Sequence, residues 1–503
     1  MNILLIVPSS KLNMKFFIRR AAPPLGLLSI ASYLKEHGYR VRLYDRCVEK
    51  VSLEAVIADF QPDVAGITML YTQSIHDGIE VSDLLRKKGI PVVWGGVTAA
   101  TIPEMVLREG NADYVVFSEG EITFHELLRA IEKKEPVDQI KGIAYLDESG
   151  AMRRTPDREF ADLADFPAID WSFVDPTGYF EKHLDGARMI WVYKSKGCPG
   201  QCSFCVNKRF NRSIYRKRPN EYVISEIREL VTRYGADTFG FSDETFCVRK
   251  DDLYSFCDSL RNLNLDFTWG CLTRIGLGRD DLQYMYDSGC RWIFIGMESG
   301  SPEILRRFHK SMDFSKIDEF YQSCREIGIR SLGSYIIGFP EETEEQLRDT
   351  VNMMLRNNAS VYHMNIFTAL PGTESFDYVV EKGLLDPPKT LKEWGDYSLM
   401  SELMPKFSKV PKREFYVIQN FFFWRSFFSK TATAGKPSFE FAFNLIIGTL
   451  KIIFKHNFLH VINGIFQAAR RFLRVAWFTF AYPGIRKKYN LYKKNMGKTL
   501  GKC

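Results

Sequence analysis

The chain has 503 residues, too many for one hydrophobic core, so two or three domains are expected. Its 45% hydrophobic and 26% charged residues are ordinary for a folded soluble protein, and ten cysteines in this length do not suggest a disulfide scaffold. The net charge of +7 comes from residues 451–503, which hold 12 Lys and Arg and no Asp or Glu. The other 450 residues carry 56 basic and 61 acidic side chains, so composition gives no support for nucleic-acid binding.

Strands and helices alternate along the first part of the chain, residues 1–135. The run Ile-Leu-Leu-Ile-Val at 3–7 is interpreted as a buried strand, because no basic segment or small-residue cleavage site marks a signal peptide. A cytoplasmic location is therefore expected. A helix is predicted at 23–38, and further strands at 39–45, 64–70, 90–96 and 112–121. This alternation predicts a parallel, doubly wound sheet.

Small and polar residues follow the strands of this predicted sheet. Open α/β sheets bind ligands at the carboxyl ends of their strands. The residues expected at that edge are Ser9, Thr68, Gly95, Gly96, Thr98, Glu119 and Gly120.

The pattern loosens into a predicted linker at 136–185, and a second alternating series covers 186–400. Its six strands are expected near 189–195, 238–244, 267–273, 292–299, 330–340 and 361–372. Six β/α units predict a partial TIM barrel, (β/α)6, whose chemistry lies at the carboxyl ends of its strands. Residues 401–503 are predicted to form a helical C-terminal domain rich in basic and aromatic residues.

Cys198, Cys202 and Cys205 lie in the turn-rich stretch KSKGCPGQCSFCVN, at the end of the first barrel strand. Thiolates are soft ligands that suit iron–sulfur clusters and zinc. A structural zinc site has four ligands, and no fourth Cys or His follows in this loop. Three thiols on a four-iron cluster would leave one iron open. A zinc site completed from elsewhere and three incidental buried cysteines remain the alternatives.

The C-x3-C-x2-C spacing at this position resembles the signature of radical S-adenosylmethionine enzymes. The resemblance implies a 4Fe–4S cluster held by Cys198, Cys202 and Cys205, with the open iron chelating S-adenosylmethionine. One electron then cleaves the sulfonium and generates a 5′-deoxyadenosyl radical. A one-electron reductant such as a flavodoxin or ferredoxin is the implied partner.

Residues after later strands also resemble this family. They are Asp243 in FSDE, Arg274 in CLTR, Glu298 in GMESG and Gly338 in GFPEET, and the resemblance implies that they bind S-adenosylmethionine. Arg274 could pair with its carboxylate, and the backbone at Gly338 could approach adenine. Alone, GMESG and GFPEET could be ordinary strand-to-helix turns.

The first domain resembles the Rossmann-like cobalamin-binding domain that precedes the barrel in one class of these enzymes. Pro23-Pro24-Leu25-Gly26, residues 95–98 and residues 118–121 carry the resemblance, which covers about residues 1–390 in all. The corrinoid would lie across the carboxyl edge of the sheet, with its nucleotide tail beside Gly95 and Gly96. The Asp-x-His-x-x-Gly motif that ligates cobalt is absent, and His76 in SIHDG does not fit it. A domain that no longer binds cobalamin is the alternative.

With both cofactors, the implied reaction is methylation of an unactivated carbon. Oxidative ring closure or carbon–carbon coupling without methyl transfer is the runner-up. A zinc-binding, membrane-associated scaffold is the alternative from another class. No residue is assigned a catalytic role, because the Tyr and Cys side chains are too many to rank.

The basic tail bears on the substrate. Apolar positions from Ile462 to Phe480 recur with helical spacing, and basic residues lie on the other face. Such a helix is typical of a peripheral membrane surface, which would make a lipid or other apolar molecule a plausible substrate. The alternative is that the helix caps the barrel with its Phe face in the core.

Overall fold

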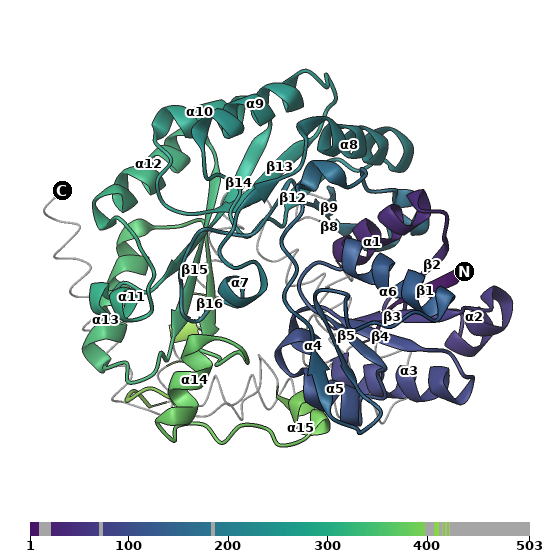
Figure 1. The fold of residues 1–503 in the computed structure, drawn as a ribbon. Helices are drawn as coiled ribbons and strands as arrows, with labels where there is room; N and C mark the ends of the chain where they lie inside the picture. Colours follow the sequence, from purple (N-terminus) through teal and green to yellow (C-terminus); the bar gives the residue numbers. More distant parts are fainter. Residues whose placement is uncertain are drawn as a thin grey trace, which may run out of the picture. The chain divides into compact units, whose positions relative to one another are not determined.

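The computed structural model describes residues 1–9, 22–69, 74–182, 187–397 and 407–411, together with residues 415, 418, 419 and 422. Residues 1–426 form one compact unit and residues 427–503 a second. The predictions for the C-terminal helix and its basic face therefore lie outside the described residues. Within the described part of the first unit are two seven-stranded sheets, here called sheet A and sheet B (Figure 1).

Sheet A confirms the predicted doubly wound sheet. Its strand order is β2-β1-β3-β4-β5-β6-β7, and β1 to β5 are mutually parallel. The strands are β1 (Asn2–Val7), β2 (Arg40–Asp45), β3 (Val64–Thr68), β4 (Val92–Gly95), β5 (Tyr114–Val116), β6 (Ile143–Leu146) and β7 (Met152–Arg154).

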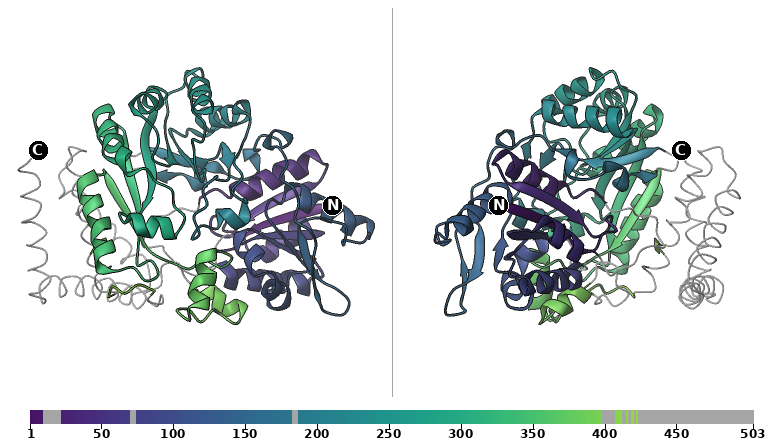
Figure 2. Two further views of the ribbon diagram at one scale, coloured as in Figure 1. Left: turned by 60° about the vertical axis from the view of Figure 1, so that its left-hand side comes forward. Right: turned by 90° about the vertical axis from the view of Figure 1, so that its right-hand side faces the viewer.

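Helices cover both faces of sheet A, as the two views in Figure 2 show. Side chains of β1 alternate between them: Ile3 and Leu5 pack in one core cluster with α1 and α6, and Leu4 and Ile6 pack in another with α2 and α3. The helices are α1 (Leu25–Glu36), α2 (Leu53–Phe60), α3 (Ile75–Lys87), α4 (Val97–Thr101), α5 (Pro103–Glu109) and α6 (Glu121–Lys133).

The stretch predicted as a linker, residues 136–185, is partly built into the sheets. Strand β6 pairs antiparallel with β5, and β7 pairs antiparallel with β6. Asp147 closes the hairpin, since its Oδ1 accepts hydrogen bonds from the backbone N–H groups of Ser149 and Ala151, each at 3.0 Å. Three 3-10 turns follow at Leu163–Asp165, Trp171–Phe173 and Pro176–Tyr179, and β8 (Glu181–Lys182) then joins sheet B.

Sheet B confirms the six parallel strands of the predicted partial barrel. Its order is β16-β15-β14-β13-β12-β9-β8, with only β8 antiparallel to its neighbour among these strands. The parallel strands are β9 (Arg188–Val192), β12 (Thr238–Phe241), β13 (Thr268–Thr273), β14 (Cys290–Glu298), β15 (Arg330–Ile337) and β16 (Val361–Ile366).

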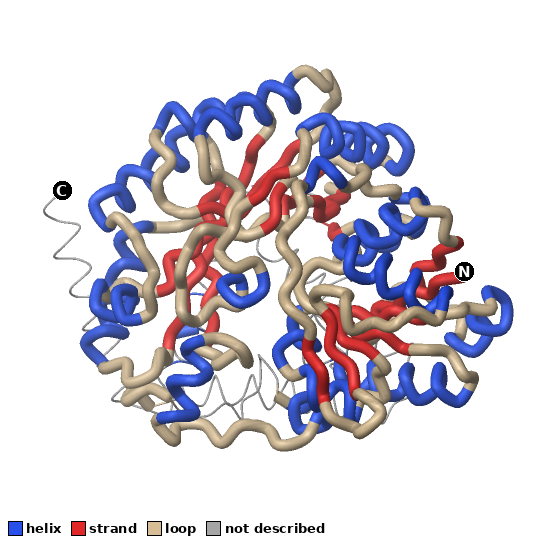
Figure 3. Tube along the Cα trace, in the orientation of Figure 1, coloured by secondary structure: helices blue, strands red, loops and turns tan. Residues whose placement is uncertain are grey.

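A row of helices packs on the outer face of sheet B, as Figure 3 shows in blue around the red strands. They are α8 (Asn220–Tyr234), α9 (Lys250–Arg261), α10 (Arg279–Asp287), α11 (Pro302–Arg307), α12 (Ile317–Ile327) and α13 (Glu344–Asn357). Shorter elements connect or follow them: β10 (Ser195–Lys196), α7 (Asn207–Phe210), β11 (Arg216–Lys217), the turn Phe314–Lys316, α14 (Glu374–Glu381) and α15 (Leu391–Asp396).

Two tryptophans lie against glycines on the inner face of sheet B. The register pairs Trp191 with Gly240, Gly240 with Gly270, and Gly270 with Trp292. A Cβ on Gly240 would lie 2.6 Å from the Trp191 ring, and one on Gly270 would overlap the Trp292 ring. The indoles meet edge to face with centroids 5.9 Å apart, so they fill this level of the inner face. No helix among the described residues is long and apolar enough to cross a membrane.

Candidate active site

The three cysteines follow β9 and β10 at the carboxyl end of sheet B. Cys202 is buried, and Cys198 and Cys205 are partly exposed. The side chain of Asn207 holds the loop at Cys198. Its Oδ1 accepts a hydrogen bond from the N–H of Cys198 at 3.1 Å, and its Nδ2 donates one to the Cys198 carbonyl at 2.7 Å. The backbone N–H of Ser203 donates to the Phe308 carbonyl at 3.0 Å. Backbone hydrogen bonds therefore hold the loop, and one of them reaches a thiol directly, because the N–H of Gly200 donates to Cys198 Sγ at 3.4 Å.

The FSDE segment after β12 supports the start of the same loop. Asp243, which was predicted to bind the cofactor, is buried and accepts hydrogen bonds from the Ser195 hydroxyl and, at 3.2 Å, from the N–H of Lys194. Burial raises the pKa of Asp243 to about 6. Glu244 accepts from the N–H of Gly197 at 2.9 Å. In this structure both carboxylates therefore contact the chain that leads into Cys198.

Charged side chains from two later strands surround the thiols. Arg274 follows β13, and its guanidinium lies 2.5 Å from where a Cβ on Gly200 would be, so a side chain at that position would displace the end of Arg274. Glu298 ends β14 and pairs with Lys310 at 3.3 Å, with side chains only 13% and 8% exposed. Sequence analysis identified Arg274 and Glu298 but missed Lys310, which lies in a polar stretch with no motif around it.

The thiols fit an iron–sulfur cluster better than a single metal ion. Burial raises the pKa of Cys205 to about 11, and burial also raises the pKa of Cys202 while the Lys310 and Arg274 charges lower it. Among the described residues, no group of three or more His, Cys, Asp or Glu side chains could hold one metal ion. In a four-iron cluster each thiolate binds its own iron, so the thiols need not converge on one point.

Gly338 ends β15 at the same edge of the sheet. Its φ of 80° is one that favours glycine, and its N–H donates to Glu342 Oε2 at 2.6 Å. Glu342 is fully buried, and its Oε1 has no hydrogen-bond partner among the residues that the structure describes. Burial raises the pKa of Glu342 to about 7. The predicted residues Arg274, Glu298 and Gly338 thus share one edge, but the structure alone assigns none of them a ligand.

The carboxyl edge of sheet A also has the predicted arrangement. Thr68 and Gly95 are register partners on β3 and β4. Gly96 has φ 93°, and a Cβ there would lie 2.9 Å from the Met69 carbonyl, which also accepts from the N–H of Thr98 at 3.0 Å. A Cβ on Gly95 would meet nothing within 4 Å among the residues that the structure describes. The turn thus presents open space above Gly95.

Ser9 and His76 are engaged with protein groups. The N–H of Ser9 donates to Asp77 at 2.6 Å, and Asp77 is paired with Arg46 at 2.8 Å. His76 Nε2 lies 2.8 Å from Asp396 of α15. His76 therefore has a carboxylate partner in this structure.

A network of ion pairs joins the two sheets at SEGE. Arg216 of β11 donates to both oxygens of Glu119, at 2.8 and 2.7 Å. Lys196 of β10 lies 2.8 Å from Glu121 and 3.3 Å from Glu119. Burial opposes ionisation of Glu121, but the Lys196 ammonium outweighs it and holds the pKa of Glu121 below its usual value. Glu119 was predicted to contact a cofactor, whereas here it binds Arg216; Gly120, beside it, begins α6.

Comparisons with known proteins agree with these two sites. Residues 18–128 match the B12 binding domain, and residues 192–354 match the Radical SAM superfamily. An uncharacterized methyltransferase of Pyrococcus horikoshii is 28% identical over 454 residues, which are 86% of this chain and 98% of that protein. The anaerobic magnesium-protoporphyrin IX monomethyl ester cyclase of Cereibacter sphaeroides is 28% identical over 370 residues, 70% of this chain and 60% of that protein.

The fold is similar to that of a solved radical S-adenosylmethionine methyltransferase, TsrM from Kitasatospora setae, with cobalamin and a [4Fe-4S] cluster bound. The TM-score is 0.63 at 18% identity, and the match covers 81% of this chain and 88% of that one. The chain is a radical S-adenosylmethionine enzyme with a B12-binding domain before its barrel. Its cofactors are a 4Fe–4S cluster, S-adenosylmethionine and cobalamin. This assignment replaces the alternatives of a zinc-binding scaffold and of a domain without cobalamin.

Proposed function

We propose that this enzyme is a cobalamin-dependent methyltransferase that acts on an unactivated carbon of an apolar substrate. The observation that carries the proposal is the ion-pair network of Glu119, Glu121, Lys196 and Arg216. It ties the carboxyl edge of sheet A to the β10–β11 ribbon, whose two strands flank the cysteine loop in sequence. A methyl donor at one site and a hydrogen-abstracting radical at the other must reach the same carbon, so the two sites have to be held together.

When bound, the cluster supplies the electron that cleaves S-adenosylmethionine, and the corrinoid supplies the methyl group. Cys198, Cys202 and Cys205 would hold the cluster. Arg274 and Lys310 are cations at its edge, and either would attract the carboxylate of S-adenosylmethionine. Lys310 is held by Glu298, so its ammonium has a fixed position before the ligand arrives.

The backbone and the aromatic side chains have separate roles. A Cβ on Gly338, whose φ is 80°, would lie 3.0 Å from the Phe415 ring, so the glycine lets this ring pack against the backbone at the end of the strand. Gly95 leaves space for the corrinoid at the edge of sheet A. Trp191 and Trp292 fill the inner face of sheet B below the cysteine loop and would exclude water from a reactive radical.

The same cofactors could support either methyl transfer or ring closure, and these two reactions give different products. The Pyrococcus horikoshii relative, named a methyltransferase, is matched over nearly its whole length, and this supports methyl transfer. The Cereibacter sphaeroides relative, named a cyclase, supports the runner-up, oxidative ring closure. We place methyl transfer first because the match to the methyltransferase extends over more of this chain.

The test is anaerobic incubation of the reconstituted enzyme with S-adenosylmethionine deuterated in its methyl group, a chemical reductant and a cell lipid extract. A product heavier by one trideuterated methyl group supports methyl transfer. A product lighter by two hydrogens, without label, supports ring closure instead. Omitting hydroxocobalamin is the control, since it should abolish the first product.

The substrate class and location are further proposals. Residues 451–503 carry 12 basic side chains and no acidic ones, and each near an anionic surface is worth about 1 kcal/mol. We therefore propose a cytoplasmic enzyme that docks at a membrane surface, with a lipid as substrate. Cosedimentation with liposomes, with and without anionic lipid, tests this, and no binding in either case would remove the proposal.

A further inference from the structure

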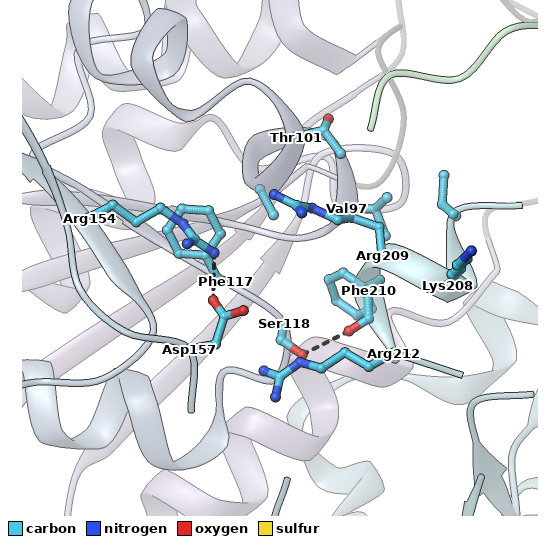
Figure 4. A pocket seen from close by; sticks show the side chains of 12 residues that line it. Val97, Thr101, Phe117, Ser118, Arg154, Asp157, Lys208, Arg209, Phe210 and Arg212 are labelled. Carbon is cyan, nitrogen blue, oxygen red and sulfur yellow. Dashed lines mark hydrogen bonds and ion pairs between the residues drawn. The ribbon is translucent and has the colours of Figure 1, made fainter. Parts of the chain in front are cut away.

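A cavity of about 170 Å³ lies between the edge of sheet A and the helix that follows the cysteine loop (Figure 4). One wall of the cavity is formed by α4 and the residues after β5. The opposite wall is formed by α7. The cavity is lined by Val97, Ala100, Thr101, Phe117, Ser118, Arg154, Asp157, Val206, Lys208, Arg209, Phe210 and Arg212. None of these residues belongs to the predicted site, although Val206 directly follows Cys205.

The lining is strongly cationic. Four basic side chains, Arg154, Lys208, Arg209 and Arg212, face one carboxylate, Asp157. Asp157 forms an ion pair with Arg154 at 2.5 Å, and Lys208 forms one with Glu374 outside the cavity. Two guanidinium groups, those of Arg209 and Arg212, are therefore left without a carboxylate partner among the described residues.

These two guanidinium groups differ in how firmly they are held. Arg212 donates to the Arg158 carbonyl at 2.7 Å and lies 4.6 Å from the centre of the Phe160 ring. This fixes the side chain but leaves its charge uncompensated, because a carbonyl and a ring face carry no net charge. Arg209 is exposed and makes no ion pair or hydrogen bond within the described part of the chain. Arg212 is therefore a fixed cation and Arg209 an adaptable one on the lining of the same cavity, and guanidinium groups suit an incoming anion.

The backbone around the cavity is held in an unfavourable conformation. Ser118, Arg212 and Ser213 all have left-handed backbones, with φ of 59°, 49° and 56°. Non-glycine residues adopt this region at a cost, and they keep it only where neighbours impose it. Here the Ser118 hydroxyl donates to the Phe210 carbonyl at 3.0 Å, which locks the two walls together (Figure 4).

We propose that this cavity is a binding site for a phosphate-type oxyanion. The volume admits a phosphoryl group but not a whole corrinoid, and guanidinium groups match phosphate oxygens in charge and geometry. The oxyanion could be the phosphodiester of the corrinoid nucleotide tail, or an anionic group on the substrate. The first source rests on the proposed binding of the corrinoid at the adjacent Gly95-Gly96 turn.

The experiment uses the full-length protein with three probes: hydroxocobalamin, cobinamide and inorganic phosphate. Cobinamide keeps the corrin ring but lacks the nucleotide and its phosphodiester. Affinities are measured by absorbance titration for the corrinoids, and by calorimetry for phosphate added to cobalamin-loaded protein. The variants are Arg209→Gln and Arg212→Gln, with Arg209→Lys as the charge-preserving variant. Arg228→Gln, an exposed arginine on α8, is the control.

Two results would support the proposal and identify the source. If the corrinoid supplies the oxyanion, each Gln variant binds hydroxocobalamin about tenfold more weakly or worse, while cobinamide binding is unchanged. If the substrate supplies it, both corrinoids bind as in wild type, and phosphate binding is lost in the Gln variants. In either case Arg209→Lys retains part of the affinity and Arg228→Gln has none of these effects.

Other results would overturn it. Unchanged affinity for all three probes, or an equal loss for both corrinoids without loss of phosphate binding, would show that the cavity recognises no oxyanion. Because Arg209 is exposed, its substitution should leave folding intact even if Arg212→Gln does not fold. A wild-type protein that binds neither corrinoid would contradict the proposed function, and a phosphate titration of the corrinoid-free protein would then decide the present inference separately.

Discussion

Arg216 and Glu119 are joined by two parallel hydrogen bonds, of 2.8 and 2.7 Å, between the barrel and the cofactor-binding sheet. Their side chains are only 12% and 11% exposed. A paired, bidentate contact of this kind fixes direction as well as distance. It therefore sets the position of the ribbon β10–β11, and through Lys196 that of the cysteine loop, relative to the edge of sheet A.

Breaking this pair should destabilise the protein. Arg216→Gln leaves Glu119 largely buried beside Lys196 alone, and we expect a loss of about 2 kcal/mol, measured as a lower midpoint of urea unfolding. Arg216→Lys keeps the charge but not the fork, so an intermediate loss is expected. Arg233→Gln, which breaks the exposed pair with Glu229, is the control and should shift stability by less than about 0.5 kcal/mol. Equal effects of Arg216→Gln and Arg233→Gln would contradict the role given to the network.

The two glycines at the end of β4, Gly95 and Gly96, should respond differently to alanine. Gly96→Ala forces a side chain onto φ 93° and against the Met69 carbonyl, so we expect a loss of about 2 kcal/mol or more. Gly95→Ala meets no atom of the described part of the chain within 4 Å and should leave stability unchanged. If the corrinoid lies on this turn, Gly95→Ala nevertheless weakens binding of hydroxocobalamin, measured by absorbance after gel filtration. Normal corrinoid binding by a folded Gly95→Ala protein would place the cofactor elsewhere.

Lys310 should matter for S-adenosylmethionine rather than for the cluster. Lys310→Met removes a nearly buried cation and leaves Glu298 unpaired, so binding of a carboxylate-bearing ligand should weaken about tenfold or more. Iron and sulfide content after reconstitution should be unchanged. Calorimetry with S-adenosylmethionine measures the effect, and Lys316→Met, an exposed lysine paired with Asp313, is the control. Loss of iron in the Lys310→Met protein would instead indicate a role in holding the loop.

Glu342 should make stability depend on pH. Burial raises its folded pKa to about 7, above the ordinary value of 4.5. Between these values the unfolded chain has lost the proton while the folded chain retains it, so stability falls as pH rises from 4.5 to 7. The total effect is about 3 kcal/mol. Glu342→Gln removes the titration but keeps an acceptor for the Gly338 N–H.

The measurement is the difference in urea midpoint between Glu342→Gln and wild type at pH 5 and pH 8. We expect the stability of Glu342→Gln relative to wild type to increase from pH 5 to pH 8. Only wild type has a buried carboxyl group at this position, and its ionisation destabilises the folded protein. Other titrating groups are common to both proteins and cancel in the difference. A pH-independent difference would show that Glu342 is ionised in the folded protein over the whole range.

The fold was largely predictable because most strands in both sheets are parallel. Parallel strands are separated by helices along the chain, so apolar runs such as 64–70 and 292–299 are visible in the sequence as separate strands. The β6–β7 hairpin was missed because Met152–Arg154 is a polar strand and the region is rich in Pro and Asp. The Asp147 turn, with Gly150 after it, was the signal that could have identified it.

The site was predictable where residues are close in sequence and not where folding assembles them. Cys198, Cys202 and Cys205 share one loop, so spacing was sufficient. Lys310 lies more than 100 positions after the cysteines. It reaches Glu298 only because the chain that follows α11 lies at the carboxyl edge of the sheet. Glu119 looked like a cofactor residue because of its position after β5, yet its partner Arg216 lies on a two-residue strand that no periodicity could reveal.

The most direct test of the account is electron paramagnetic resonance of anaerobically reconstituted, reduced protein before and after addition of S-adenosylmethionine. We predict the signal of a reduced 4Fe–4S cluster whose g values shift when the ligand is added, and loss of that signal in the Cys198→Ala, Cys202→Ala, Cys205→Ala triple variant. A cluster signal that S-adenosylmethionine leaves unchanged, or protein that binds zinc and assembles no cluster, would contradict it.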